Sequence, residues 1–192
     1  MRLPPVLLVL LAFALPLRAQ EPFAAEGQRP PSAVAQTFLH FGQPYGGWLL
    51  MAFDSIPASS YGFRPTPVQQ SIGHIAEHLE NANYSLCATI AGTPRIMTAK
   101  DSLADSIKAR WPKDTLIARV RASLLSCAAT IEKLTDAQLA DELIVPSPNG
   151  PVTVVRARYL MLLITDLAEH YSQIAGYMRL LGMTPPSALP KR

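Results

Sequence analysis

The chain has 192 residues, of which 49% are hydrophobic and 16% are charged, and its formal net charge is +3. A chain of this length and apolar content builds one well-packed core and is too short to suggest several domains. Its small net charge and its lack of a lysine or arginine cluster do not provide the electrostatic footprint that phosphate backbones require. Nucleic acid is therefore not expected as a partner.

The first twenty residues, MRLPPVLLVLLAFALPLRAQ, have the pattern of a secretory signal peptide. Arg2 precedes an apolar run from Leu3 to Leu17, and Ala19 is the small residue expected at a cleavage point. The run is shorter than the roughly 20 residues of a bilayer span, and an uncleaved anchor is the alternative. We expect residues 1–19 to be removed, the protein to be exported to the periplasm or the extracellular space, and no stable membrane span to remain.

The next segment, QEPFAAEGQRPP, is polar and without a period, so residues 20–31 are expected to form a flexible lead. Residues 32–192 are expected to form the single domain. A mostly apolar stretch from Ser32, an N-cap candidate, to about Ile56 predicts its first helix. A kink or interruption is expected where three helix-disfavouring residues fall, namely Pro44, Gly46 and Gly47.

The second helix is predicted by apolar residues that recur at alternating three- and four-residue steps. These residues are Ile72, Ile75, Leu79, Ala82, Leu86 and Ile90, and Gly92 and Pro94 follow them as a stop. The link from Thr93 to Lys113 contains a predicted short helix over residues 99–110. A link of this length can carry the chain from one end of a bundle to the other, so the helices that it joins need not be antiparallel neighbours.

The third helix is expected from about Asp114 to Leu134, followed by a polar turn in TDAQLADEL. After the turn-forming segment VPSPNGP, the chain is apolar and unbroken from about Val152 to Leu181, which predicts the longest helix. No strand-like alternation of useful length appears. The expected fold class is therefore all-α, a four-helix bundle with a short extra helix in the link between its second and third helices.

Two cysteines, Cys87 and Cys127, are present. In an exported protein they could form a disulfide, and two buried free thiols are an equally weighted alternative, because the sequence does not give their separation in space. Cys87 lies nine residues beyond His78, about 13 Å along a helix at ~1.5 Å per residue. These two residues therefore cannot share one metal ion.

Two short stretches place polar side chains one helical turn apart. IGHIAEH contains His74 and His78, and DLAEH contains Asp166 and His170. The second pair shares a helical stripe with Tyr159, Leu163, Ile174 and Tyr177. Burying a carboxylate costs several kcal/mol unless it is paired or bound to a metal. Histidine and aspartate on facing helices suit Zn²⁺, Ni²⁺, Fe²⁺ or Mn²⁺, and three such ligands with an open position are typical of a catalytic site.

The same spacings have an interpretation without metal. A histidine pair one turn apart is common on helix surfaces, and a hydrogen bond from Asp166 to His170 would satisfy both groups. Spacing alone leaves the two interpretations open.

Larger stretches around these residues resemble a known family. GFRPTPVQQSIGHIAEHLENANYSLC followed by DLAEHYSQIAGYMRLLGMTPP resembles the DinB-like four-helix family of metalloenzymes. The shared elements are the R-P-T-P entry to the second helix, its histidine, and the E-H-Y-x-Q and Y-x-R-x-x-G-x-x-P-P patterns of the last helix. The resemblance implies a bundle that runs up, down, down, up, a frequent homodimer, and a divalent metal held by three histidines.

Carried over by position, His78 and His170 match two of the family's ligands. The third family histidine falls at Asp166, which departs from the pattern. Aspartate is a competent ligand, but the change could also mark a weakened site, in which case His74 would supply a third imidazole from one turn before His78. The resemblance thus implies a metal set of His78, Asp166 and His170, with His74 as an optional member.

The family that the chain resembles includes thiol-dependent transferases and isomerases in which a metal lowers the pKa of a thiol. An exported protein would not meet the small cytoplasmic thiols at their usual concentrations. The expected function is therefore a metal-dependent hydrolase or transferase acting on an unknown small molecule. A non-catalytic binding or scaffold domain of the cell envelope, with a degenerate metal site, is the alternative.

Other polar residues receive expectations as well. Three acidic residues are candidates for a general base or for hydrogen bonds to the ligands, with a solvated helix face as the favoured alternative: Glu77, Glu80 and Glu169. Arg64 and Arg179 are expected to anchor a loop and to lie at a helix C-terminus. Tyr84 and Tyr171 are expected to pack between helices. His40 has no acidic or histidine partner one turn away and is left outside the site.

Overall fold

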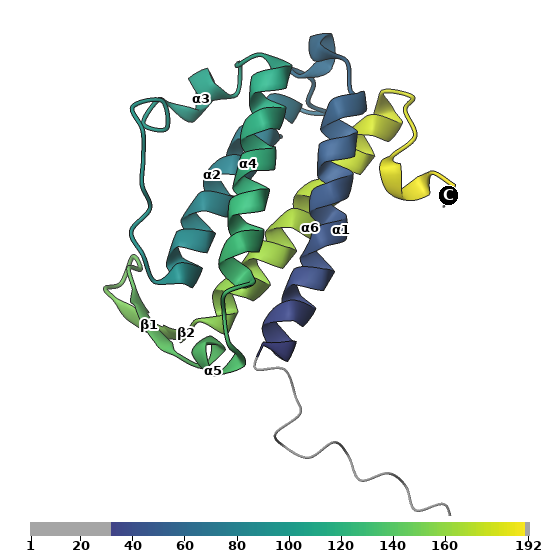
Figure 1. Cartoon of the computed structure of the whole chain (residues 1–192). Coiled ribbons are helices and arrows are strands. Elements are labelled where there is room, and N and C mark those ends of the chain that lie inside the picture. Colours follow the sequence, from purple (N-terminus) through teal and green to yellow (C-terminus); the bar gives the residue numbers. More distant parts are fainter. Residues whose placement is uncertain (1–31, 191–192) are drawn as a thin grey trace, which may run out of the picture. The chain divides into compact units, whose positions relative to one another are not determined.

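Four long helices dominate the computed structural model, which describes residues 32–190 (Figure 1). They are α1 (Ala33–Ser55), α2 (Ile72–Ala91), α4 (Lys113–Ile131) and α6 (Ala157–Leu180). The all-α prediction is confirmed. The signal peptide and lead that we expect over residues 1–31 lie outside the described residues. Within the described part, no helix is both long and apolar enough to cross a membrane.

Contacts along the helices fix their relative directions. α2 and α4 run parallel, because partners advance together along both helices: Glu80 with Arg119, Asn83 with Ser123, and Cys87 with Cys127. α1 and α4 run antiparallel, because the Lys113 ammonium donates to the carbonyl of Asp54 while the start of α1 donates to the Asp136 carboxylate that follows α4. The last helix runs opposite to α2, since Arg156 before α6 reaches the carbonyl of Ile90. The order is therefore up, down, down, up (Figure 1).

The core lies between these four helices and is filled by apolar side chains from each of them. Its fully buried members include Leu49 and Phe53 of α1, Ile75 and Leu79 of α2, Leu116 and Val120 of α4, and Leu160 and Ile174 of α6. The amphipathic stripe that predicted the second helix is thus the face that α2 buries.

The first helix is continuous, so the expected interruption in its middle is wrong. Pro44 lies inside α1 and is exposed. A proline removes the hydrogen bond to the carbonyl four residues earlier, here that of His40. His40 is also exposed, so water can satisfy its carbonyl, and packing of Leu49 and Phe53 holds the rest of the helix.

The link between α2 and α4 is less helical than expected. Only α3 (Asp105–Lys108) is a helix, in place of the predicted residues 99–110. The link is held by a buried ion pair, because Lys108 Nζ lies 2.6 Å from Glu77 Oε1 on α2 and 3.0 Å from Asp105 Oδ1. A second pair joins Arg119 of α4 to Glu80 and to Asp101 of the link.

A short β-hairpin precedes the last helix, which corrects two expectations. β1 (Glu142–Val145) pairs antiparallel with β2 (Val152–Val155), with Val145 opposite Val152. The helix predicted from about Val152 therefore begins at Ala157, after the hairpin.

The predicted polar turn contains the short helix α5 (Asp136–Leu139). Thr135 and Gln138 cap its N-terminus with reciprocal hydrogen bonds. Two short 3-10 helices, η1 (Ala58–Ser60) and η2 (Pro186–Ala188), complete the described elements.

The two cysteines form a disulfide between α2 and α4. Cys87 and Cys127 are buried, and their Cα atoms lie 5.4 Å apart. Of the two alternatives that the sequence left open, the structure has the bonded one. The bond closes a sequence separation of 40 residues, so it restricts the unfolded chain and ties the two parallel helices together.

The close approach of α2 to the link generates a stability prediction. A Cβ on Gly73 would lie inside van der Waals contact with the carbonyl oxygen of Ala109. We expect Gly73→Ala to lower the free energy of unfolding by about 1–3 kcal/mol through overpacking. Gly176→Ala in α6 is the matched control, because a Cβ there meets nothing within 4 Å, and it is expected to be neutral or stabilising by up to about 1 kcal/mol. Urea denaturation of both variants checks this, and equal effects would contradict it.

Candidate metal site

α2 places His78 at the edge of its buried face. The helix begins after Ser71, whose side chain accepts a hydrogen bond from the backbone N–H of His74, and it ends at Gly92 in the left-handed conformation. Ile75 and Leu79 next to His78 are fully buried. The imidazole therefore projects at the border between core and solvent, with 37% of its side chain exposed.

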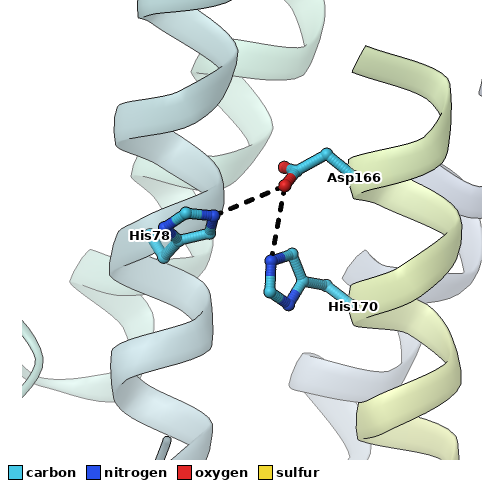
Figure 2. Close-up of side chains that lie close together, drawn as sticks. All are labelled: His78, Asp166 and His170. Atoms are coloured by element: carbon cyan, nitrogen blue, oxygen red, sulfur yellow. Dashed lines mark hydrogen bonds and ion pairs between the residues drawn. The ribbon is translucent and has the colours of Figure 1, made fainter. Parts of the chain in front are cut away.

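α6 supplies Asp166 and His170, one helical turn apart and facing α2 (Figure 2). Leu163, Leu167 and Ile174 of the same helix are buried, so the pair lies on the face that packs into the bundle. His170 is buried, and the Asp166 side chain is 22% exposed. The predicted stripe of α6 thus brings both polar groups into the helix interface.

The three side chains converge on one point (Figure 2). Asp166 Oδ1 lies 3.4 Å from His78 Nε2 and 3.4 Å from His170 Nε2. The two imidazole rings have centroids 4.7 Å apart. One potential ligand atom from each residue lies within 4.8 Å of the others. The structure therefore brings together the three residues that the sequence predicted as ligands.

The hydrogen-bond pattern of this cluster places acceptor atoms opposite each other, and these require a positive charge between them. His170 Nδ1 lies 2.8 Å from Gln173 Oε1, so Nδ1 carries the proton and Nε2 of the neutral ring is a free acceptor. It faces the acceptor oxygen of Asp166, whose second oxygen, Oδ2, is buried without a hydrogen-bond partner in the described structure. Acceptors that face each other are stable only with a cation between them, either protons on the imidazoles or a metal ion.

The shifts in the pKa of Asp166 and of His170 indicate the same requirement for positive charge. Burial by itself raises the pKa of Asp166, but hydrogen bonds from His170 and His78 outweigh it and hold that pKa below its usual range. Burial by itself lowers the pKa of His170, but the Asp166 carboxylate and Gln173 raise it above the ordinary value. Both shifts favour an ionised carboxylate surrounded by positive charge.

These residues fit a divalent transition metal. Two imidazole nitrogens and one carboxylate oxygen are ligands that Zn²⁺, Ni²⁺, Fe²⁺ and Mn²⁺ accept. Gln173 would fix the orientation of His170 and keep its Nε2 directed at the ion. The exposed flank of His78 leaves one side of the cluster open to solvent.

The remaining predicted histidines and the cysteine lie elsewhere. His74 is not part of the converging group and instead lines a separate cavity with Arg64, Arg110 and Lys113. Cys87 is bonded to Cys127, so it is no ligand, as the helix length predicted. His40 is exposed on α1.

The acidic candidates divide into two kinds. Glu169 is exposed, as expected. Glu77 and Glu80 are only 2% and 3% exposed, so the expected solvated helix face is wrong for both. Their carboxylates pair with Lys108 and Arg119, cations from the link and from α4 that the sequence pattern of α2 alone does not reveal. Neither glutamate belongs to the converging group.

Other expected roles are structural. Arg64 donates to the carbonyl of Pro67 and anchors the loop before α2, and Arg179 lies in the last turn of α6. Tyr171 packs on Trp48 of α1, with ring centroids 5.2 Å apart, and its hydroxyl accepts from the backbone N–H of Ser187. Tyr84 is half-buried.

Sequence reasoning missed the role of Gln173. It lies three residues after His170 and enters the sequence patterns only as the last residue of E-H-Y-x-Q. Side chains at this spacing are neighbours on a helix, and a metal-binding histidine commonly donates its second ring N–H to such a partner. The three-residue spacing from a predicted histidine ligand could therefore have indicated the role of Gln173.

Comparison with known proteins gives the family. A family model described as the DinB superfamily matches residues 48–174, which include all three converging residues. The chain belongs to the DinB superfamily. No curated protein matches the chain.

Solved structures share the fold at low sequence identity. A conserved protein from Enterococcus faecalis is 14% identical with a TM-score of 0.62, and the match covers 78% of this chain and 98% of that one. A DinB-like protein from Bacillus cereus is 19% identical with a TM-score of 0.61, covering 79% and 95%. A mycothiol-dependent maleylpyruvate isomerase is 12% identical with a TM-score of 0.60, covering 73% and 60%. The chain thus spans about three-fifths of the isomerase.

The charge balance of the cluster can be measured directly. In protein treated with a chelator, we expect the pKa of His170 to lie above its ordinary 6.5. Asp166→Asn should lower that pKa below the wild-type value, because burial remains and the attractive charge is lost. Glu169→Gln is the matched control with a small effect, since Glu169 is exposed. NMR titration of the imidazole resonances checks both, and an unchanged value in Asp166→Asn would contradict the assigned geometry.

Proposed function

We propose that this protein is an exported, metal-dependent enzyme that holds one divalent ion with His78, Asp166 and His170. The observation that carries the proposal is the convergence of three ligand atoms at a carboxylate whose second oxygen is buried and has no hydrogen-bond partner among the described residues. Zn²⁺, Ni²⁺, Fe²⁺ and Mn²⁺ are the ions that this ligand set suits.

The protein's own residues would prepare the site in three ways. Gln173 holds the Nδ1 proton of His170 and so keeps Nε2 available. Asp166 adds one negative charge, and buried Leu163 and Leu167 on its helix limit access of water from the core side. A divalent ion bound there supplies Lewis-acid chemistry, which polarises a substrate group or lowers the pKa of a nucleophile.

The open flank suggests the kind of substrate. His78 is the most exposed of the three side chains, so a substrate would approach from solvent at the edge of α2 and α6. One structural neighbour is a mycothiol-dependent isomerase, which supports small-molecule chemistry on this fold. For an exported protein we propose hydrolysis or group transfer that does not depend on a cytoplasmic thiol.

A non-catalytic binding or scaffold domain is the second candidate. Its supporting observation is that Asp166 contacts both imidazoles, so protonated histidines would balance the cluster without metal. Metal content separates the two proposals.

Metal analysis of protein purified without a histidine tag tests the ligand set. We expect about one ion per chain, and we expect His78→Ala and His170→Ala to weaken binding by more than the roughly 10- to 100-fold typical for loss of an outer hydrogen-bond partner. His40→Ala and His74→Ala are matched controls that should retain the ion. Adding the ion to apo protein at about 100 times its Kd should stabilise the fold by roughly 2.7 kcal/mol. Metal-free protein whose melting is unchanged by Zn²⁺, Ni²⁺ or Mn²⁺ would contradict the proposal.

Export has its own test. The N-terminal pattern and the disulfide both support an oxidising compartment outside the cytoplasm. In a host with a secretion pathway, we expect the mature chain to begin at Gln20 and to contain no thiol that reacts under denaturing, non-reducing conditions. Intact mass and thiol titration measure these properties, and a full-length chain with two free thiols would count against export.

A further inference from the structure

A polar cavity of about 560 Å³ lies at the end of the bundle beside α3 (Figure 1). Its walls come from the loop before α2, the start of α2, α3 with the residues that follow it, and the start of α4. His78, Asp166 and His170 do not line this cavity. It is therefore a second candidate site, and its occupancy is independent of the proposed metal-dependent function.

Three cationic side chains line the cavity, namely Arg64, Arg110 and Lys113. They come from separate segments: the loop before α2, the residues after α3, and the first turn of α4. No aspartate or glutamate is among the described residues of the lining. The fold thus gathers three positive charges around one cavity whose own walls carry no negative charge.

Contacts within the chain leave the charge of these three side chains unpaired. Arg64 donates to the carbonyl of Pro67, and Lys113 Nζ donates to the carbonyl of Asp54. Both acceptors are neutral. The Arg110 residue is exposed, and among residues 32–190 none of the three cations forms an ion pair with a carboxylate. Their guanidinium and ammonium groups therefore keep donors available for an anion.

Three carboxylates lie near the cavity without lining it. Asp105 is already paired with Lys108, at 3.0 Å. Burial, with a contribution from Asp54 and Asp114, raises the pKa of the Tyr61 hydroxyl, which places both carboxylates close to this wall residue. Both are exposed, so water screens them. An anion in the cavity would thus contact the cations directly and meet these carboxylates only through solvent.

Neutral groups of the lining add further donors. Ser71 and Ser106 contribute hydroxyl groups, and Trp111 contributes an indole, whose N–H can only donate. α4 begins at the cavity without a side-chain cap on its first N–H groups, so the positive end of its dipole adds charge of the same sign as the side chains. A wall of cations and donors is complementary to a negatively charged acceptor.

Charge, rather than volume, indicates the class of anion. The cavity is open to solvent, so its volume does not limit what a bound group is attached to. Guanidinium groups hold oxyanions through paired N–H donors, and an ammonium adds a point charge. Three unpaired cations exceed the single charge of a carboxylate. A phosphate monoester carries about −1.5 to −2 at pH 7 and three strong acceptor oxygens, which matches them better.

We propose that this cavity binds a phosphate group, either free or as the monoester of a small molecule. Arg64 and Arg110 donate to its oxygens, and Lys113 supplies the third positive charge. The substituent of an ester extends through the open side of the cavity.

NMR titration of the purified protein with sodium phosphate at constant ionic strength tests the proposal. The backbone amide resonances of Ser106, Arg110 and Lys113 should shift and saturate together. Acetate, with one charge, should bind more weakly than phosphate by about threefold or more. Tighter binding of glycerol phosphate than of inorganic phosphate would identify an ester as the ligand, and the reverse would identify the free anion. Either order supports the site. No saturable shift, or equal shifts with sodium chloride, would overturn it.

Variants locate the site. Arg64→Gln and Arg110→Gln should each weaken phosphate binding by about fivefold, as expected for exposed ion pairs, and the double variant should show no saturable binding. Arg110→Gln guards against a disturbed loop in Arg64→Gln, because Arg110 is not the residue that anchors it. Arg158→Gln, which removes an exposed arginine of α6 outside the lining, is the matched control and should bind as the wild type does.

A metal-site variant separates this cavity from the proposed metal ion, which could itself bind phosphate. His78→Ala should keep the phosphate affinity of the wild type, because His78 does not line the cavity. Loss of phosphate binding in His78→Ala, or wild-type affinity in the double arginine variant, would overturn the proposal.

Discussion

A carboxylate inside a helix bundle needs positive charge within reach, and this requirement organises the contacts of α2 with the link, α4 and α6. Three carboxylates lie at those contacts: Glu77 of α2 against the link, Glu80 of α2 against α4, and Asp166 of α6 against α2. Two of them are neutralised by permanent cations, since Glu77 pairs with Lys108 and Glu80 with Arg119. Asp166 faces only imidazoles, whose charge depends on protonation. The two glutamate pairs are therefore self-sufficient and structural, whereas the aspartate cluster retains capacity for an added cation.

The topology explains how a cation of the link reaches α2. Because α2 and α4 run parallel, the chain must return along the whole length of the bundle between them, and that return segment brings Lys108 to Glu77 of α2 and Asp101 to Arg119 of α4. The disulfide between Cys87 and Cys127 ties the other end of the same helix pair. α2 is thus fixed at both ends. His78 lies between these anchors, so the helix that carries it is held by contacts that do not involve Asp166 or His170.

The helices were predictable where one face is buried along the whole element, as for α2 and α6. The sequence could not place the link, because its conformation depends on Lys108 meeting Glu77, a contact between residues far apart in sequence. The hairpin was missed because each strand has four residues, too few to show a period. The β-branched run VTVV after a Pro-Asn-Gly turn was nevertheless a usable indication of a hairpin.

The three converging residues of the site were predicted from their spacing and from the family resemblance. Choosing between Asp166 and His74 needed three dimensions, since both stand one turn from a predicted ligand and only one faces the neighbouring helix.

Aspartate at the position where the DinB-like resemblance leads us to expect histidine changes the charge of the site more than its shape. Two neutral imidazoles and a carboxylate would leave a net charge of +1 on a bound divalent ion, in place of the +2 left by three imidazoles. A less positive ion is a weaker Lewis acid but a better match for a partly buried interface, because less charge has to be desolvated. The Gln173 contact that orients His170 is present beside the changed residue. A site that had merely decayed would have no need of that contact, and a carboxylate with a buried, unpartnered oxygen would be a costly residue for it to retain.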